Sequence, residues 1–152
     1  MLETANGNLL DADVEALVNA VNTVGVMGKG IALQFKSRFR EMFVAYGRAC
    51  KSGELQAGRM HVFKISETSN PLFIINFPTK RDWREASRMD DIEKGLAALR
   101  QEIQMRGIRS VAVPALGCGN GGLNWRRVFP AIQRALGDLE DVRVLVFPPD
   151  TR

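Results

Sequence analysis

The chain has 152 residues, of which 45% are hydrophobic and 25% charged. This composition is typical of one folded domain and excludes an intrinsically disordered chain. Two cysteines and one histidine exclude a disulfide framework, a four-cysteine zinc site and the two-histidine metal motifs. The net charge of +4 is compatible with a polyanionic ligand and equally with ordinary variation among soluble proteins.

We expect no targeting signal from this sequence. No apolar run approaches the ~20 residues that span a bilayer. Residues 1–8 are neither basic nor strongly apolar, so we expect no secretory leader. A cytoplasmic protein without a metal or cofactor is therefore expected, whose chemistry uses carboxylate, amide, amine or backbone groups.

The hydrophobic pattern predicts helices that alternate with apolar strands. Residues 16–22 form a short apolar run typical of a buried strand. Residues 31–53 carry apolar side chains at helical spacing, as one helix or as two broken near Ser37. The other expected elements are strands at 60–65, 72–77, 110–115 and 142–147, a helix capped by Asp90 and ended by Gly107, and a helix capped by Asn124 that Pro130 kinks or delays.

The order of these elements predicts the fold class. With one strand before residue 16, the order is strand, strand, helix, strand, strand, helix, strand, helix, strand. Helices between apolar strands imply a three-layer α/β/α domain with a mixed, mostly buried sheet. We find no repeat or linker, so residues 1–152 are expected to form a single domain.

Two glycine-rich loops, 25–30 and 117–122, each lie between a predicted strand and a predicted helix. Glycine lets backbone N–H groups approach an anion closely, and the following helix N-terminus adds partial positive charge. Two such loops would suit a diphosphate, although glycines in one loop often serve only a tight turn. The P-loop pattern is absent, because Lys29 is followed by Gly30 and not by serine or threonine.

A dinucleotide-type G-x-G-x-x-G pattern matches at Gly117, Gly119 and Gly122. Dinucleotide-binding folds open with this motif, whereas here only one predicted strand follows it. The match is weak support for a nicotinamide-dependent enzyme, which stays an alternative. Cys118, within this loop, is interpreted as a small residue that suits the backbone, because no sequence link joins it to His61, which we expect to be structural.

Polar residues follow two of the predicted strands. Asn19 and Asn22 close the first apolar strand, where an amide can bind sugar hydroxyls or simply satisfy loop backbone. Lys80 closes the strand that starts at residue 72, at the end of a sheet where ligands of α/β proteins bind. A lysine there can hold a phosphate or attack a sugar aldehyde carbon, or be merely solvated.

A basic turn with an aromatic residue follows Lys80. Arginines can contact phosphates while a base stacks on a tryptophan, so this pattern suits single-stranded nucleic acid. A packing tryptophan on a solvated turn is the alternative. The candidate DNA-binding residues are Arg81, Trp83, Arg84 and Arg88.

Five blocks in this order resemble the macrodomain family, which binds ADP-ribose in a cleft over a mixed six-stranded sheet. They are residues 7–10, 16–22, 28–32, 76–80 and 114–119. The Gly28-Lys29-Gly30 form and the Pro78-Thr79-Lys80 block resemble the branch of terminal ADP-ribose glycohydrolases that act through a lysine. Within that branch, residues 76–84 are most similar to the DarG antitoxin family, which removes ADP-ribose that a DarT-type toxin attaches to thymidine in single-stranded DNA.

This resemblance implies the roles of individual residues. Lys80 would be catalytic together with Asn22, which would bind the distal ribose. Asn8, Leu9 and Phe147 would lie at the adenine end, and the two loops would wrap the diphosphate and the distal ribose. The implied ADP-ribose contacts are Asn8, Leu9, Asn19, Ala20, Val21, Asn22, Gly28, Lys29, Gly30, Ile31, Thr79, Gly117, Cys118, Gly119, Asn120, Gly121, Gly122 and Phe147.

One departure concerns the second loop. Protein-directed relatives in the lysine branch also use an aspartate there, whereas residues 119–124 contain no acid. Lys80 would then work with Asn22 or with assistance from the substrate itself. Its amine would either attack the ribose carbon, giving a transient imine, or act as an acid or electrostatic partner for the leaving base.

The expected function is hydrolysis that releases ADP-ribose from thymidine in single-stranded DNA. The alternatives are an ADP-ribose reader that does not hydrolyse, and a protein ADP-ribosyl hydrolase without DNA specificity. The expected partners are ADP-ribosylated single-stranded DNA and a DarT-type toxin. Because residues 148–150 read as a domain boundary, we expect the toxin-binding part to lie outside this chain, in a longer antitoxin.

Overall fold

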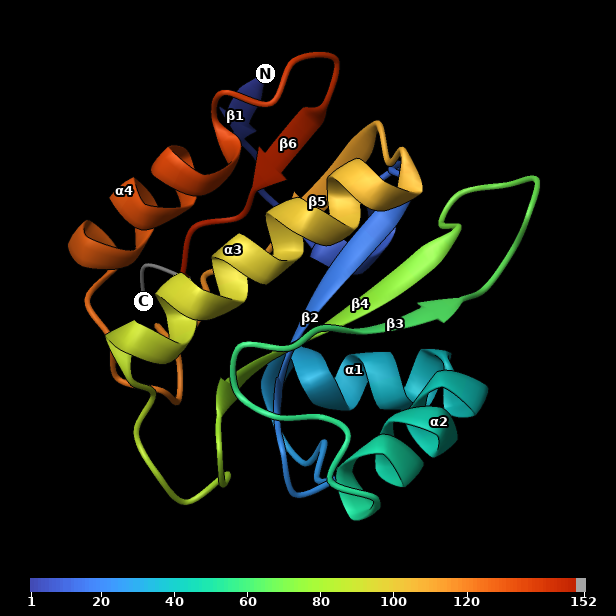
Figure 1. Ribbon diagram of the computed structural model, residues 1–152, viewed down its shortest axis with the longest axis vertical. Helices are drawn as coiled ribbons and strands as arrows, with labels where there is room; N and C mark the ends of the chain where they lie inside the picture. The colour runs from blue at the N-terminus through green and yellow to red at the C-terminus, as the bar shows by residue number, and fades with distance from the viewer. Residues whose placement is uncertain (150–152) are drawn as a thin grey trace.

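Six strands form one mixed sheet in the computed structural model of the chain, which describes residues 1–149 (Figure 1). The sheet order is β1-β6-β5-β2-β4-β3, and each pairing is parallel except that of β3 with β4. The strands are β1 (Leu2–Thr4), β2 (Ala16–Asn22), β3 (His61–Lys64), β4 (Phe73–Lys80), β5 (Ser110–Val113) and β6 (Arg143–Val146). The predicted six-stranded mixed sheet is therefore confirmed.

Helices cover both faces of the sheet. They are α1 (Gly30–Arg38), α2 (Arg40–Lys51), α3 (Met89–Arg106) and α4 (Trp125–Leu136), with a short 3-10 helix, η1, at Leu9–Asp11. Figure 1 shows α3 and α4 grouped on one side of the strands and α1 and α2 on the other. No helix among residues 1–149 is both long and apolar enough to cross a bilayer.

Alternation along the strands explains the two helical layers. In β2, Ala16 and Val18 belong to the core under α3 and α4, whereas Leu17 and Val21 belong to the core under α1 and α2. Successive strand residues point to opposite faces, so an apolar run without alternating polar residues needs a helical layer on each side. This arrangement confirms the predicted three-layer α/β/α class.

One local detail differs from the sequence-based expectation, at the start of the third helix, whereas the α1–α2 break at Phe39 falls near Ser37 as expected. The third helix begins at Met89, so Asp90 lies in its first turn and does not cap it. Asn124 caps α4 as predicted, accepting a hydrogen bond from the Arg126 N–H at 2.9 Å, and Pro130 lies inside α4 without delaying its start.

Strand β4 also runs further than expected, through Pro78 to Lys80. Strand β3 pairs only with residues 73–76 of β4, so beyond Asn76 one side of β4 has no neighbouring strand in the described part of the chain. Proline is tolerated on such an edge because no ladder hydrogen bond is lost there. The extension carries Lys80 to the carboxyl end of the sheet.

The strand order places the predicted motifs together. Strands β5, β2 and β4 are neighbours, and their carboxyl ends lead into loop 117–122, loop 22–30 and Lys80, respectively. The chain leaves β2 toward α1 on one face and leaves β5 toward α4 on the other. Adjacent parallel strands whose connections leave to opposite faces open a crevice between them, which is where α/β proteins bind ligands.

Candidate active site

The second glycine loop (residues 117–122) has a backbone that favours glycine at three positions. Gly117 and Gly122 have positive φ angles of 73° and 77°. A Cβ atom on Gly117 would lie 2.7 Å from Leu123 Cδ1, and a Cβ atom on Gly121 would lie 2.2 Å from Ser87 Oγ. The Leu123 N–H closes the loop by donating to the Gly117 carbonyl at 2.9 Å.

The same loop leaves consecutive N–H groups available. Within residues 1–149, the backbone N–H groups of Gly119, Asn120 and Gly121 donate to no protein acceptor. A Cβ atom on Gly119 would meet nothing within 4 Å, so the space beside this residue is open. Successive unpaired N–H groups that face open space form an anion-binding concavity.

Two contacts from outside hold this loop in place. The Ser87 N–H donates to the Gly121 carbonyl at 3.0 Å, and Lys80 Nζ donates to the Asn120 carbonyl at 3.1 Å. A carbonyl and the next N–H point in opposite directions across one peptide plane. The hydrogen bonds to the Asn120 and Gly121 carbonyls therefore orient the N–H groups of Gly121 and Gly122. Ser87 has no sequence signature of a site and was not foreseen.

The first glycine loop (residues 22–30) is organised by Asn22. Its Oδ1 atom accepts hydrogen bonds from the N–H groups of Val24 and Val26, both at 3.2 Å, and its Nδ2 atom donates to the Val26 carbonyl at 2.7 Å. The loop then enters α1 at Gly30, and Lys29 at the N-cap provides no side-chain hydrogen bond. The first-turn N–H groups of α1 are thus left for another acceptor.

Tyr46 in α2 forms hydrogen bonds with Asn22 that hold it in place. Its buried hydroxyl lies 2.7 Å from the Asn22 carbonyl oxygen and 2.9 Å from Asn22 Oδ1. Burial raises the pKa of Tyr46 well above its ordinary value near 10, so the phenol remains a donor at any physiological pH. The apolar stripe of this helix indicated only a core position, because helical spacing does not reveal what a phenol oxygen contacts.

Tyr46→Phe is expected to loosen the first loop without unfolding the domain. The change removes the donor shared by two Asn22 oxygens, and we expect the free energy of unfolding to fall by about 1 kcal/mol. Denaturant unfolding measures this loss, and calorimetry with ADP-ribose measures its effect on the loop. Unchanged stability would mean that the hydroxyl contributes no net hydrogen bond.

Lys80 lies beside Asn22. The two residues are register partners across β4 and β2, just past an irregularity between Val21 and Asn22. Lys80 Nζ donates to the carbonyls of Asn120 at 3.1 Å and Trp83 at 3.4 Å. Within residues 1–149 it forms no ion pair with a carboxylate. The sheet therefore brings Lys80, Asn22 and the second glycine loop together, and the shared site that the resemblance implies for them stays a prediction.

The turn after Lys80 (residues 81–88) is mostly exposed, but two of its arginines already form ion pairs. Arg81 pairs with the buried Asp91 at 3.4 Å. Arg84 chelates Asp82 through two hydrogen bonds at 2.8 and 2.9 Å, which lower the pKa of Asp82 to about 2. Trp83 remains half exposed beneath the Arg84 guanidinium.

The residues predicted at the adenine end come from three parts of the chain. Asn8 is exposed, caps η1 by accepting the Leu10 N–H at 3.1 Å, and donates to Gln34 of α1 at 3.2 Å. Leu9 and Phe147 are buried together in the core under α1 and α2. Their contacts with adenine stay predictions.

Asn19 and its neighbours in β2 lie deeper. Asn19 is fully buried, and its Nδ2 atom donates to Asn76 Oδ1 at 3.1 Å, whereas its Oδ1 atom has no partner within residues 1–149. Ala20 is half-buried, and Thr79 Oγ1 donates to the Val21 carbonyl at 3.5 Å. The predicted ADP-ribose contacts of these β2 residues and of Thr79 stay untested.

Cys118 and His61 have the environments expected of structural residues. Burial raises the pKa of the Cys118 thiol to about 11, so it remains protonated near neutral pH and is a poor nucleophile. His61 lies in β3, where its Nδ1 atom is 3.1 Å from Asn76 Nδ2. Burial lowers the pKa of His61, which keeps the ring neutral.

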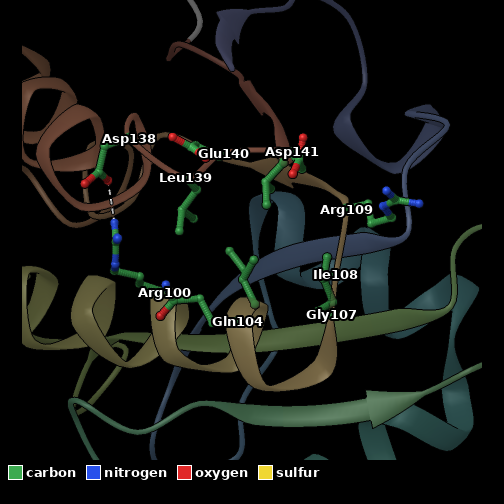
Figure 2. A pocket seen from close by; sticks show the side chains of 11 residues that line it. Arg100, Gln104, Gly107, Ile108, Arg109, Asp138, Leu139, Glu140 and Asp141 are labelled. Atoms are coloured by element: carbon green, nitrogen blue, oxygen red, sulfur yellow. Dashed lines mark hydrogen bonds and ion pairs between the residues drawn. The ribbon is translucent and has the colours of Figure 1, made fainter.

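A cavity of about 500 Å³ lies at the other end of the sheet (Figure 2). Its lining includes Ile108 and Arg109, which precede β5, whereas the second glycine loop follows β5. Figure 2 shows Arg100 of α3 paired with Asp138 across this cavity. The cavity is therefore separate from the crevice that holds Lys80.

The fold and the crevice define the class of protein. The chain belongs to the macro domain family, whose model matches residues 18–132. Among solved structures, the chain is similar to the macrodomain of Thermus aquaticus DarG, with 53% sequence identity and a TM-score of 0.95. The match covers 98% of this chain and 99% of the DarG macrodomain chain.

Two further comparisons name activities and ligands of relatives. A Thermus aquaticus protein named DNA ADP-ribosyl glycohydrolase is 53% identical over 98% of this chain. The structure of Thermosipho africanus DarTG in complex with ADP-ribose is 37% identical, covers 99% of this chain and 42% of its own, and has a TM-score of 0.92. The chain spans 41% of the length of the curated Thermus relative.

Proposed function

We propose that this chain is a glycohydrolase that removes ADP-ribose from thymidine in single-stranded DNA. The observation that carries the proposal is the position of Lys80, beside Asn22 and in contact with the Asn120 carbonyl of the second glycine loop. This amine lies at the crevice of a macrodomain that is 53% identical to a protein named DNA ADP-ribosyl glycohydrolase. ADP-ribose is a substrate fragment and product here, and no resident cofactor is invoked.

The two glycine loops are suited to the diphosphate. The N–H groups of Gly119, Asn120 and Gly121 and those of the first turn of α1 have no protein acceptor within residues 1–149, and the two segments that carry them follow the neighbouring strands β5 and β2. A diphosphate carries enough negative charge to use both sets of donors. The distal ribose would then extend toward Asn22 and Lys80, the last residues of the neighbouring strands β2 and β4.

The geometry at Lys80 Nζ is compatible with two chemical roles. Its two hydrogen bonds to carbonyls leave one position on nitrogen. In the neutral amine this position is a lone pair, which can attack ribose C1 as the ring opens; the C1–N bond to thymine then breaks, the base leaves with a proton, and water hydrolyses the resulting imine to release ADP-ribose and the free amine. In the ammonium form it is a third N–H, which can donate to the leaving base.

A direct assay tests the proposed reaction. The chain is incubated with thymidine-ADP-ribosylated single-stranded DNA and, in parallel, with ADP-ribosylated protein, and released ADP-ribose is quantified. Release from DNA supports the proposal. Release from protein alone would favour a protein ADP-ribosyl hydrolase, and binding without release from either would favour a reader module. Borohydride added during turnover traps the imine as a stable secondary amine, which mass spectrometry locates.

Trp83→Ala is expected to weaken turnover of an ADP-ribosylated oligonucleotide by roughly tenfold. The half-exposed indole can stack on a base, an interaction of ~1–3 kcal/mol. Arg84→Ala is expected to act less strongly, because Arg84 is held by Asp82. Affinity for free ADP-ribose should be unchanged in both variants. Equal losses on the modified oligonucleotide and on a modified nucleoside would contradict a role in binding flanking DNA.

We further propose that the chain is the macrodomain part of a longer antitoxin. The chain spans less than half of the curated relative's length, and the Thermosipho relative is named a fusion of a DNA ADP-ribosyl transferase with a DNA ADP-ribosyl glycohydrolase. A DarT-type toxin would supply the modified DNA that this site consumes. Co-expression of this chain with such a toxin, followed by measurement of ADP-ribose on DNA, tests the pairing.

A further inference from the structure

The basic turn after Lys80 (residues 81–88) carries a net charge of only +1. Two of its arginines are consumed by ion pairs with Asp82 and Asp91. Residues 80–91 contain as many acids as bases: Asp82, Glu85, Asp90 and Asp91 against Lys80, Arg81, Arg84 and Arg88. A DNA strand that passes the crevice therefore needs phosphate contacts beyond this turn.

The beginning of α4 has the opposite character. Residues 117–127 include no acid, and Arg126 and Arg127 are exposed. Neither arginine forms an ion pair within residues 1–149. Both lie in the first turn of α4, near the positive end of the helix dipole, where cations lower helix stability. Their position thus lowers the stability of α4, which indicates that these arginines serve a function other than stabilising the fold.

These arginines lie close to the second glycine loop in the chain, because α4 begins three residues after Gly122. On the other side of the loop, the Ser87 N–H donates to the Gly121 carbonyl, which places Arg88 next to the loop as well. Arg88 is exposed and also unpaired in the described part of the chain. Figure 1 shows α3 and α4 beginning on the same side of the molecule.

We propose that Arg126 and Arg127, with Arg88, bind phosphates of the DNA strand that flanks the modified thymidine. This inference rests on the proposed function and specifies how its substrate is held. The strand would run from Trp83 past the second glycine loop onto the first turn of α4. Guanidinium groups suit this role, because they can bind phosphate through two parallel hydrogen bonds.

The test compares two double variants that lose the same charge. Arg126→Gln/Arg127→Gln removes the proposed contacts. The matched control is Arg109→Gln/Arg134→Gln, since Arg109 precedes β5 at the far end of the sheet and Arg134 lies in the last turn of α4. For each protein, kcat/KM is measured on an ADP-ribosylated thymidine oligonucleotide and on ADP-ribosylated thymidine. The salt dependence of the affinity for the oligonucleotide and the Tm of each protein are measured as well.

We expect the Arg126/Arg127 variant to lose roughly tenfold or more in kcat/KM on the oligonucleotide and less than twofold on the nucleoside. The slope of log affinity against log salt should decrease in magnitude by about 1.4, as for two lost phosphate contacts on a single strand. Its Tm should be equal or higher, because two cations leave the positive end of a helix.

An equal loss in the control variant, or an unchanged oligonucleotide rate in the Arg126/Arg127 variant, would overturn the proposed phosphate contacts. A wild-type chain that releases no ADP-ribose from either thymidine substrate would instead overturn the proposed function. The two failures are therefore distinguishable.

Discussion

Replacing Lys80 with alanine is expected to lower the rate of ADP-ribose release from DNA by about 10²–10⁴-fold, the range typical of a lost acid–base group. The sheet places this amine beside Asn22 and in contact with the Asn120 carbonyl of the second glycine loop. Affinity for free ADP-ribose should fall only a few-fold, because Ser87 still holds the Gly121 carbonyl when the Lys80 contact is lost. Single-turnover kinetics and calorimetry measure the two effects separately.

Lys80→Arg separates the two chemical roles of this residue. Arginine keeps a positive charge and hydrogen-bond donors but cannot form an imine under these conditions. Substantial activity in Lys80→Arg would assign Lys80 to electrostatic stabilisation of the leaving base. Full activity in Lys80→Ala would remove the residue from the mechanism, and a parallel loss of ADP-ribose binding and turnover would assign it to anchoring the ligand.

Gly119→Glu is expected to reduce ADP-ribose affinity by at least about 100-fold. The free protein has open space at the Cβ position of Gly119 and an ordinary φ angle there, so the variant should fold. The new carboxylate would lie in the loop that carries the unpaired N–H groups of residues 119–121, and it would repel a diphosphate bound there. Isothermal calorimetry with ADP-ribose measures the loss.

Gly47→Glu is the matched control for this change. Gly47 lies within α2, and a Cβ atom there also meets nothing within 4 Å. The substitution alters net charge by the same amount and replaces a glycine inside a helix, which favours stability. We expect its ADP-ribose affinity to be unchanged. If Gly119→Glu bound ADP-ribose as tightly as Gly47→Glu, the diphosphate would have to lie elsewhere.

Local patterns along the chain were sufficient to predict the architecture. The apolar run at residues 16–22 needs helices on both faces of the sheet, because consecutive strand residues point in opposite directions. The Asn124 cap and the helix end at Gly107 depend on neighbouring backbone atoms alone and are confirmed. The cap predicted at Asp90 was wrong: α3 begins one residue earlier, at Met89, and Asp91 in its first turn is buried and pairs with Arg81, a contact that local sequence does not show.

The sequence predicted which groups form the candidate site but not how they come together. The glycine loops and the position of Lys80 after an apolar strand were readable, because they depend on residue type and order. Their convergence required the β5-β2-β4 order, which brings together strands that begin at residues 110, 16 and 73. Hydrophobic periodicity indicates which face of a sheet each residue occupies, but not which strands are neighbours. The sequence pattern therefore could not predict the strand order that brings these segments together.

The sequence by itself determined which backbone could approach an anion and which side chain could act as an amine. Tertiary structure decided how those groups are held: Tyr46 beneath Asn22, Ser87 against Gly121, and Asp82 and Asp91 on the arginines of the predicted DNA-binding turn. Each of these contacts except that of Asp82 joins residues at least ten positions apart. Hydrogen bonds and ion pairs depend on distances of a few ångströms, and only folding sets such distances between remote segments.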